Sequence, residues 1–258
     1  MTEWRRFCSQ VRDQGSCGSC TAFGAIGAWE PLIRIQANDA SLDIDLSESD
    51  LFSCSGGTCE GGNTVENVLN RALYGVCLES CLPYRPTNRS CGEGRCSKWW
   101  ETGKKLKEWL PVDDTGEMKS LLDRGPLAGT MAVHQSFLNY VDGVYHNLGI
   151  MDPVVGYHMI AIVGYEDSLG AWLIRNSWGT GWGMNGYCWI KYGDSEIDVE
   201  MYYLEPDGPI DPEPEPEPQP CPYSLAVVKL PGGKWLLRNY RKVRKALLGI
   251  EPGSYPPA

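Results

Sequence analysis

One cysteine of this chain lies where its thiol would be activated. Cys20 closes a glycine-punctuated loop within residues 14–23 (QGSCGSCTAF), and the apolar run that follows it predicts a helix. A thiol at a helix N-terminus feels the positive end of the helix macrodipole, which favours the thiolate, the nucleophilic form of the group. The sequence therefore predicts a cysteine nucleophile at position 20.

A nucleophilic thiol needs a base, and the chain has only three histidines, His134, His146 and His158. His158 opens an apolar run over residues 158–165 that predicts a strand, where an imidazole would be held rigidly. An isolated histidine in such a place is more often a satisfied, half-buried side chain. The pairing of Cys20 with His158 therefore needs support from a wider pattern.

That wider pattern resembles the papain-like cysteine proteases. Residues 14–23 resemble the nucleophile segment of the family, residues 158–165 its catalytic-histidine strand, and residues 175–187 (RNSWGTGWGMNGY) its asparagine segment. Residues 47–54 (SESDLFSC) and 59–62 (CEGG) match further landmarks in the same order, and the likeness covers roughly residues 8–204. Three long motifs at family spacing make the resemblance highly specific.

The resemblance implies a cysteine endopeptidase that works through a thioester acyl-enzyme. Cys20 would attack the scissile carbonyl, and His158, as an imidazolium, would pair with the thiolate and then protonate the leaving amine. Asn176 would fix the orientation of the histidine ring, with Trp178 covering their hydrogen bond. The Gln14 side-chain amide and the Cys20 backbone N–H would form the oxyanion hole.

Substrate contacts are implied by the same resemblance. Gly61 and Gly62 are similar to the strand edge that pairs with an extended substrate. The S2 pocket would be lined by residues of the β half, namely Met131, Thr130 and either Val155 or Gly156, with Glu200 at its floor. An acid there would accept Arg or Lys at P2 beside apolar residues, whereas a solvated surface acid is the alternative reading of Glu200.

Three positions depart from the family pattern. Thr21 stands where the family usually has tryptophan, so we expect altered packing behind the nucleophile without loss of activity. Tyr157 precedes the histidine where several relatives carry Asn or Asp, which is expected to affect the pH profile or the S1′ side. Glu60 replaces a usual asparagine in the glycine-rich loop.

The elements that must position these residues fall into two groups. Helical patterns occupy residues 21–37 and 64–74, and Ser47 followed by acidic residues predicts a third helix start. Short strands are predicted at residues 127–133, 143–145, 158–165, 171–175 and 186–191. The expected fold class is α+β, a papain-like two-subdomain fold: a helical half with the nucleophile helix, a β-barrel-like half, and the active-site cleft between them.

The predicted peptidase domain spans residues 1–205, with the helical half at about 10–105 and the β half at about 106–205. An acidic Pro/Glu linker follows at 206–222, with the composition of an extended spacer. Residues 223–258 form a basic tail with seven Lys or Arg and one acid, and Leu236, Tyr240, Val243 and Leu247 would share one helical face. Such a tail would dock on the acidic body, lie on an anionic surface, act in processing or sorting, or remain a solvated helix.

Eleven cysteines indicate a disulfide framework and a secreted or extracytoplasmic protein. The resemblance implies the bridges Cys17–Cys59 and Cys54–Cys91. Six further cysteines have no implied partner and allow 15 pairings: Cys8, Cys77, Cys81, Cys96, Cys188 and Cys221. If Cys20 stays free as the nucleophile, ten cysteines remain, an even number that suits five bridges. A zinc site is the weaker interpretation of these cysteines, because histidines are few and no Cys-x-x-Cys module repeats. We therefore expect no metal and no cofactor.

The net charge and the lengths of the apolar runs argue against two further classes of protein. A formal charge of −10 argues against nucleic-acid binding, and no apolar run reaches the roughly 18 residues of a membrane helix. The expected partners are protein or peptide substrates of a monomer. Relatives are made as zymogens, and since about 19 residues precede Cys20, the sequence is expected to be a mature form in which the signal and propeptide are not present.

Residues 99–118 show no clear insertion that would block one end of the cleft, which favours an endopeptidase over an exopeptidase. Two alternatives stay open: a catalytically silent relative that binds peptides or a partner, and an acyl transferase or transpeptidase using the same triad. The intact Cys20, His158, Asn176 and Gln14 favour an active enzyme over the silent relative.

Overall fold

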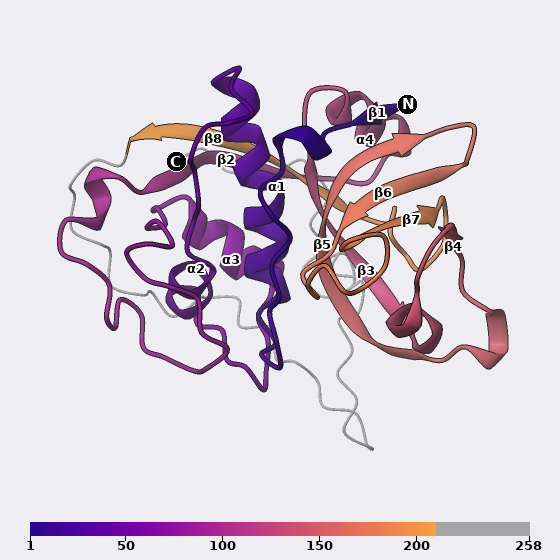
Figure 1. The fold of residues 1–258 in the computed structure, drawn as a ribbon, viewed down its shortest axis with the longest axis horizontal. Coiled ribbons are helices and arrows are strands. Elements are labelled where there is room, and N and C mark those ends of the chain that lie inside the picture. Colours follow the sequence, from indigo (N-terminus) through magenta and orange to yellow (C-terminus); the bar gives the residue numbers. More distant parts are fainter. Residues whose placement is uncertain (210–258) are drawn as a thin grey trace, which may run out of the picture. The chain divides into compact units, whose positions relative to one another are not determined.

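The structure, a computed structural model, describes residues 1–209, which lie within a compact unit formed by Met1–Pro214. Helices gather on one side of this unit and most strands on the other (Figure 1). The helices of the first side are α1 (Cys20–Gln36), α2 (Glu48–Cys54) and α3 (Val65–Ala72). The expected α+β class is confirmed.

The long helix α1 is the element on which both sides pack. All of its residues from Thr21 to Leu32 are buried, so this part of the helix has no free face. Its small residues allow backbones to approach closely: a Cβ on Gly24 would lie 2.7 Å from Met159 Cγ, and one on Gly27 would lie 2.9 Å from Arg175 Nη1. Glycine at these two positions therefore lets α1 lie directly against the sheet.

The sheet has eight strands in the order β2-β8-β3-β5-β6-β7-β4, with β1 attached to β5. Neighbours pair antiparallel except β4 and β7, which are parallel. The strands are β1 (Thr2–Glu3), β2 (Lys104–Val112), β3 (Leu127–His134), β4 (Val144–Tyr145), β5 (Val154–Glu166), β6 (Ala171–Arg175), β7 (Tyr187–Lys191) and β8 (Met201–Pro209). All five predicted strands are present, whereas β1, β2 and β8 were not predicted.

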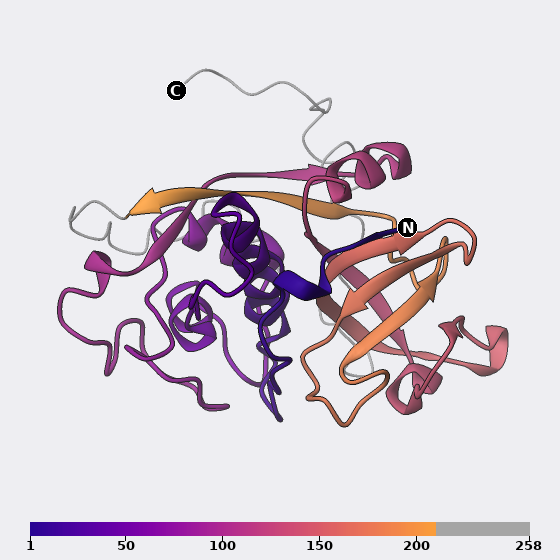
Figure 2. The same ribbon diagram turned by 45° about the horizontal axis from the view of Figure 1, so that its top comes forward.

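Strands β2 and β8 form a long pair that passes over the helical side (Figure 2). Residues 206–209 belong to β8, with Pro206 opposite Leu106 and Pro209 opposite Lys104, so the expectation of a linker beginning at residue 206 is wrong for these four residues. A further unpredicted helix, α4 (Thr115–Leu122), follows β2 and is capped by Asp114, whose side chain accepts a hydrogen bond from the Glu117 N–H. Short 3-10 helices complete the fold: η1 (Arg5–Phe7), η2 (Trp99–Glu101), η3 (Gln135–Asn139) and η4 (Gly149–Met151).

Strand β5 contributes to two separate apolar cores, because its side chains alternate between the two faces of the sheet. Met159, Ala161 and Val163 pack in the core shared with the helices. Ile160 and Ile162 pack in a second core, enclosed by the β half. The strand that carries His158 is thus held from both sides.

Two of the disulfides are the pairings that the resemblance implied, Cys17–Cys59 and Cys54–Cys91, and a third joins Cys81 to Cys96. The expectation of five bridges around a single free cysteine is wrong. Within residues 1–209, Cys8, Cys77 and Cys188 are unpaired as well as Cys20, and Cys77 and Cys188 are buried in apolar packing. A buried cysteine behaves as a small apolar residue and needs no partner.

The predicted tail, residues 223–258, and most of the predicted linker lie outside the described residues. Among residues 1–209 no helix is both long enough and apolar enough to cross a membrane.

Candidate active site

Cys20 is the first residue of α1, as its position after the glycine-rich loop predicted. Its thiol accepts a hydrogen bond from the backbone N–H of Met159, the residue after His158. Because the N–H groups of the first helical turn have no intrahelical acceptor, the Cys20 N–H is free of a helix bond. The nucleophile candidate therefore lies where the start of α1 meets β5.

His158, near the start of β5, is 6% exposed and its ring is fixed by two neighbours. Its Nε2 lies 2.8 Å from Asn176 Oδ1, and since an amide oxygen only accepts, Nε2 carries the proton. The Trp178 ring lies over the imidazole, with centroids 4.9 Å apart and planes 31° apart. With Nε2 engaged, Nδ1 is the nitrogen left to exchange a proton.

Gln14 is buried and its amide is held at both ends. Nε2 donates to the Cys17 carbonyl at 2.9 Å, and Oε1 accepts from the Ser177 hydroxyl at 2.7 Å. The backbone N–H of Gln14 donates to the Ser177 carbonyl at 2.9 Å, which joins this segment to the one that carries Asn176. An amide nitrogen has two protons, so one N–H of Gln14 remains for a further acceptor.

Tyr84, which the sequence gave no reason to select, links Gln14 to the nucleophile loop. Its hydroxyl donates to the Gln14 carbonyl at 2.8 Å and lies 2.7 Å from the Ser19 hydroxyl. The single phenol proton is committed to the carbonyl, so Ser19 must donate to the phenol oxygen. The Tyr84 ring packs edge-on against Phe23 at 4.7 Å, which fixes the phenol against the first turn of α1.

Burial disfavours the charged form of Cys20 and the charged form of His158 when each group is considered alone. It raises the pKa of the Cys20 thiol, although the Met159 N–H acts in the opposite direction. It lowers the pKa of His158 to about 4, although the hydrogen bond to Asn176 favours the imidazolium. Charge on either group therefore depends on an opposite charge forming beside it.

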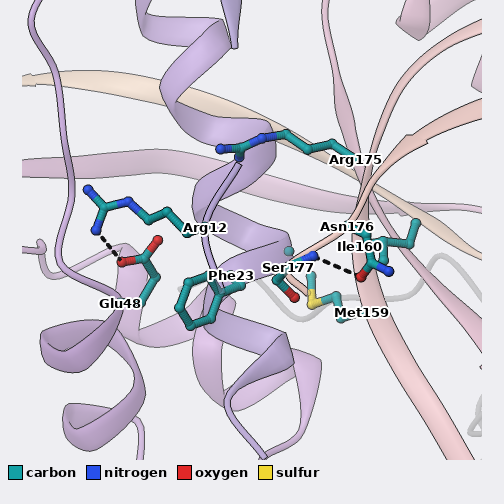
Figure 3. Close-up of a pocket in the computed structure, with 9 residues that line it drawn as sticks. Arg12, Phe23, Glu48, Met159, Ile160, Arg175, Asn176 and Ser177 are labelled. Carbon is teal, nitrogen blue, oxygen red and sulfur yellow. Dashed lines mark hydrogen bonds and ion pairs between the residues drawn. The ribbon is translucent and has the colours of Figure 1, made fainter. Parts of the chain in front are cut away.

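A small cavity lies behind the site, with room for about one water molecule (Figure 3). Asn176 and Ser177 line one side and Arg12 and Glu48 the other. Asn176 Nδ2 and one Glu48 oxygen are buried there without a hydrogen-bond partner among residues 1–209. Burial raises the pKa of Glu48 to about 8, against the effect of Arg12 at 3.5 Å.

The expected S2 lining needs one correction. Met131 is 1% exposed and packs in the core of the β half with Ile160 and Ile162, so it does not face the cleft. Thr130, one residue earlier, points to the opposite face of β3, because side chains alternate along a strand. Thr130 lies opposite Met159, and a Cβ added to Gly156 would meet no atom within 4 Å, so both remain candidates.

Glu200 is half-buried and immediately precedes β8, where Met201 lies opposite Gly129. Its carboxylate accepts a hydrogen bond from the Tyr202 hydroxyl at 2.5 Å. Burial raises the pKa of Glu200; the Tyr202 bond lowers it, and the nearby Glu66 of α3 raises it again. The solvated surface acid considered for Glu200 is therefore not what the structure contains.

The glycine-rich loop does not present an open strand edge. The Gly62 N–H donates to the Thr58 carbonyl at 2.7 Å, and the Gly61 N–H donates to the Thr58 hydroxyl at 3.1 Å. The expected pairing of a substrate with these N–H groups would first have to displace Thr58. The loop is itself tied to the nucleophile segment, because Gly18 N–H donates to the Cys59 carbonyl at 2.9 Å.

The structure shows the surroundings of the three residues that depart from the family pattern. Thr21 is 6% exposed and its hydroxyl is buried without a partner among the described residues, as expected of a position built for a larger apolar group. Tyr157 is 38% exposed beside His158. Glu60 accepts a hydrogen bond from Asn88 Nδ2 at 2.8 Å and is exposed.

Sequence reasoning missed Tyr84, Ser177 and Met159. Ser177 and Met159 each follow a predicted site residue, so adjacency was the available signal. Tyr84 lies 65 residues from Ser19 and 70 from Gln14, and nothing local marks it. Among residues 1–209 no group of three or more His, Cys, Asp or Glu side chains is arranged to hold a metal ion.

Comparisons with known proteins point to one family. Residues 1–206 match the family described as Papain family cysteine protease. A cathepsin B-like cysteine proteinase 3 of Caenorhabditis elegans is 30% identical over 221 residues, covering 74% of this chain and 59% of that protein. The chain thus spans about three fifths of the length of that curated relative.

The structure of digestive procathepsin L2 proteinase from the larval midgut of Tenebrio molitor is similar with a TM-score of 0.66 and 27% identity, over 79% of this chain and 67% of that one. The family matches most of the chain, and the fold of the chain is similar to that structure. This chain belongs to the papain family of cysteine proteases.

Proposed function

We propose that this chain is an active cysteine endopeptidase, with Cys20 as nucleophile, His158 as acid and base, Asn176 as the residue that orients the histidine, and Gln14 as an oxyanion donor. One observation carries the proposal above the others. The His158 ring is fixed by Asn176 and Trp178 at the point where the Cys20 thiol meets β5, which leaves Nδ1 as the proton acceptor.

Ionisation would occur as a single proton transfer from the thiol to Nδ1. Burial disfavours each charge alone, but the transfer creates both charges side by side, and their attraction is strong where water is largely excluded. The start of α1 and the Met159 N–H stabilise the thiolate, and Asn176 stabilises the imidazolium.

The thiolate sulfur would then attack the substrate carbonyl carbon, and the carbonyl oxygen would become an oxyanion. The second N–H of Gln14 and the Cys20 backbone N–H are the donors placed to bind it. Collapse of this intermediate breaks the C–N bond, leaves a thioester on Cys20, and sends the imidazolium proton to the leaving amine. Water, deprotonated by His158, then hydrolyses the thioester and restores the thiol.

Proteins or peptides are the proposed substrates. Residues 99–118, where an insertion could block the cleft, form η2, β2 and the start of α4, and β2 is paired with β8. We therefore favour cleavage within chains over removal of terminal residues. The three disulfides favour an extracytoplasmic location.

The test uses a peptide blocked at both termini, with products identified by mass spectrometry. The wild type should cleave it internally, Cys20→Ala should not, and Gln14→Ala should lose about 10²–10³ in kcat because one oxyanion donor is removed. Gln10→Ala, a change of an exposed glutamine, is the matched control. Cleavage that survives Cys20→Ala, or a wild type that leaves the blocked peptide intact, would refute the proposal.

A further inference from the structure

A second small cavity lies in the helical half, where basic and polar side chains line it together with the rings of Phe52 and Tyr84. Its walls come from α2, through Phe52 and Ser53, and from the segment that carries Arg85, Asn88 and Arg89. No acidic side chain lines it. It has room for about one particle of the size of a water molecule.

Two of these side chains hold hydrogen-bond donors that are buried without partners. Nε and Nη1 of Arg89 and Oγ of Ser53 contact no hydrogen-bonding atom among residues 1–209, and Ser53 is only 9% exposed. A guanidinium keeps its charge, and Arg89 as a whole is half-buried, so the missing partners concern its Nε and Nη1. Buried donors without partners, one of them charged, are rare in proteins because each costs free energy.

Three acids of the segments around the cavity are already engaged elsewhere. Glu93 accepts a hydrogen bond from the Ser90 N–H at 3.0 Å, and Glu60 accepts one from Asn88 at 2.8 Å. Asp50 pairs with Arg95 at 3.1 Å and accepts from the Cys77 N–H at 2.9 Å. None of them compensates Arg89, although the whole chain carries a formal charge of −10.

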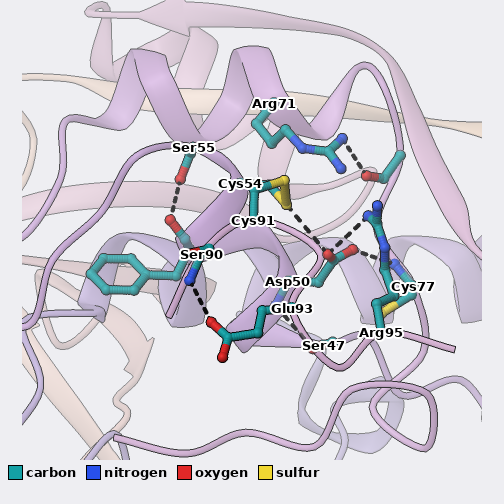
Figure 4. Close-up of a disulfide and its surroundings, with 12 residues drawn as sticks. Ser47, Asp50, Cys54, Ser55, Arg71, Cys77, Ser90, Cys91, Glu93 and Arg95 are labelled. Carbon is teal, nitrogen blue, oxygen red and sulfur yellow. Dashed lines mark hydrogen bonds and ion pairs between the residues drawn. A yellow bond between two sulfur atoms is a disulfide. The ribbon is translucent and has the colours of Figure 1, made fainter. Parts of the chain in front are cut away.

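A disulfide joins the two segments that line the cavity. The Cys54–Cys91 disulfide joins the residue after Ser53 to the segment that carries Arg89 (Figure 4). On the other side, Asn88 Oδ1 accepts a hydrogen bond from the Cys59 N–H at 2.7 Å. The chain on each side of Arg89 is therefore tied to the helical half, and Arg89 and Ser53 both line the cavity.

We propose that this cavity binds one small monovalent anion of the size of chloride. Arg89 Nε and Nη1 and the Ser53 hydroxyl donate to the anion, and Arg85 adds positive potential. Chloride is already slightly larger than water, so a space of this size leaves no room for the larger oxyanions. Tyr84 also lines the cavity, but the proposal concerns ligand binding and does not depend on peptidase activity.

The first test measures thermal unfolding of the full chain at constant ionic strength while sodium chloride replaces sodium gluconate. Gluconate is too large to enter the cavity. Wild-type Tm should rise by about 2–4 °C and saturate with chloride, as expected when an anion binds only the folded state. Arg89→Met should lose this rise, while Arg6→Met, a change of an exposed arginine outside the cavity, should keep it.

A second test covers the case in which Arg89→Met does not fold. Ser53→Ala removes one neutral donor and should raise the chloride concentration at half-saturation about 5-fold. Wild-type crystals soaked in sodium bromide should show an anomalous peak between Arg89 and Ser53. No bromide peak, with equal Tm in chloride and gluconate, would mean that water satisfies these donors and would overturn the proposal. A bromide peak without any chloride-dependent Tm would mean binding at crystal concentration only and would overturn it too.

Discussion

At the residue scale, Tyr84 contacts both sides of the proposed oxyanion hole. Its hydroxyl donates to the Gln14 carbonyl and accepts from Ser19, the residue before the nucleophile. It touches neither the thiol nor the imidazole in any hydrogen bond of the structure. We therefore regard Tyr84 as a positioning residue that acts through Gln14 and the Cys20 N–H.

Tyr84→Phe should lower kcat for amide hydrolysis about 10-fold, because two hydrogen bonds that align the oxyanion donors are lost. The rate of Cys20 alkylation by iodoacetamide should change less than about 2-fold, because that displacement forms no oxyanion and tests only the thiolate. Steady-state kinetics and stopped-time alkylation measure the two rates.

Tyr145→Phe is the matched control. Tyr145 also packs edge-on against a phenylalanine, Phe137 at 4.9 Å, and its hydroxyl also contacts a serine, Ser136 at 2.9 Å. It lies in the β half and should leave both rates near the wild-type values. An equal loss of hydrolysis and alkylation in Tyr84→Phe would show that the residue supports the fold and not the oxyanion hole.

Glu200 gives a prediction about pH. Its pKa is raised by burial and by Glu66, so the carboxylate forms only above the ordinary range of a glutamate. A preference for Arg over Leu at P2 should therefore be present at high pH and disappear as pH falls through the raised pKa. The ratio of kcat/KM for two blocked substrates that differ at P2 measures this.

Glu200→Gln should make that ratio independent of pH, because no charge remains to titrate. An unchanged pH dependence in the variant would assign the preference to another group, and a flat ratio in the wild type would remove Glu200 from the S2 pocket.

The sequence predicted the site unevenly, for physical reasons. Cys20, His158, Asn176 and Gln14 lie in long motifs, and the structure places all four in one hydrogen-bonded region. Met131 was assigned to the wrong face because a shift of one residue along a strand reverses the side chain.

At the element scale, the contact of α1 with β5 holds the thiol against the histidine strand. Gly24, one turn after Cys20, lies against Met159, whose N–H donates to the thiol. The closeness of this contact depends on the absence of a side chain at position 24.

Gly24→Ala should therefore lower the free energy of unfolding by about 1–3 kcal/mol, because the new Cβ must displace Met159 or its backbone. It should also slow Cys20 alkylation, because the Met159 N–H moves with the strand. Gly181→Ala is the control, since a Cβ there meets no atom within 4 Å. Chemical denaturation measures the first effect, and a variant as stable as the control would refute the tight contact.

The predicted helices and strands were those with clear periodicity. The missed elements lack it: β2 (KKLKEWLPV) carries charges and a proline, and β8 (MYYLEPDGP) contains two prolines and a glycine. These two strands are stabilised by pairing with each other across nearly 100 residues of sequence, a contact that no local pattern reveals. Helix α4 is short and begins TGE, with a glycine in its first turn.

At the scale of the whole described molecule, the site needs both the helical side and the sheet, because each contributes part of its residues. The segment with Gln14 and the start of α1 supply the proposed nucleophile and oxyanion donors, whereas β5 supplies His158 and the residue after β6 is Asn176. Backbone bonds between residues 12–14 and 177–179 join the two: Gln14 N–H to Ser177 O and Gly179 N–H to Arg12 O. We therefore expect Cys20 to be active only when both sides are assembled.

The most direct test of that claim is intact-mass analysis after incubation with an epoxysuccinyl thiol-protease inhibitor, in wild type and Cys20→Ala. We predict a single adduct on the wild type, mapped to Cys20, and none on the variant. Cys77 and Cys188 should stay unlabelled because burial raises the pKa of each thiol. No adduct on the folded wild type, or an adduct that persists in Cys20→Ala, would contradict an activated thiolate at this position.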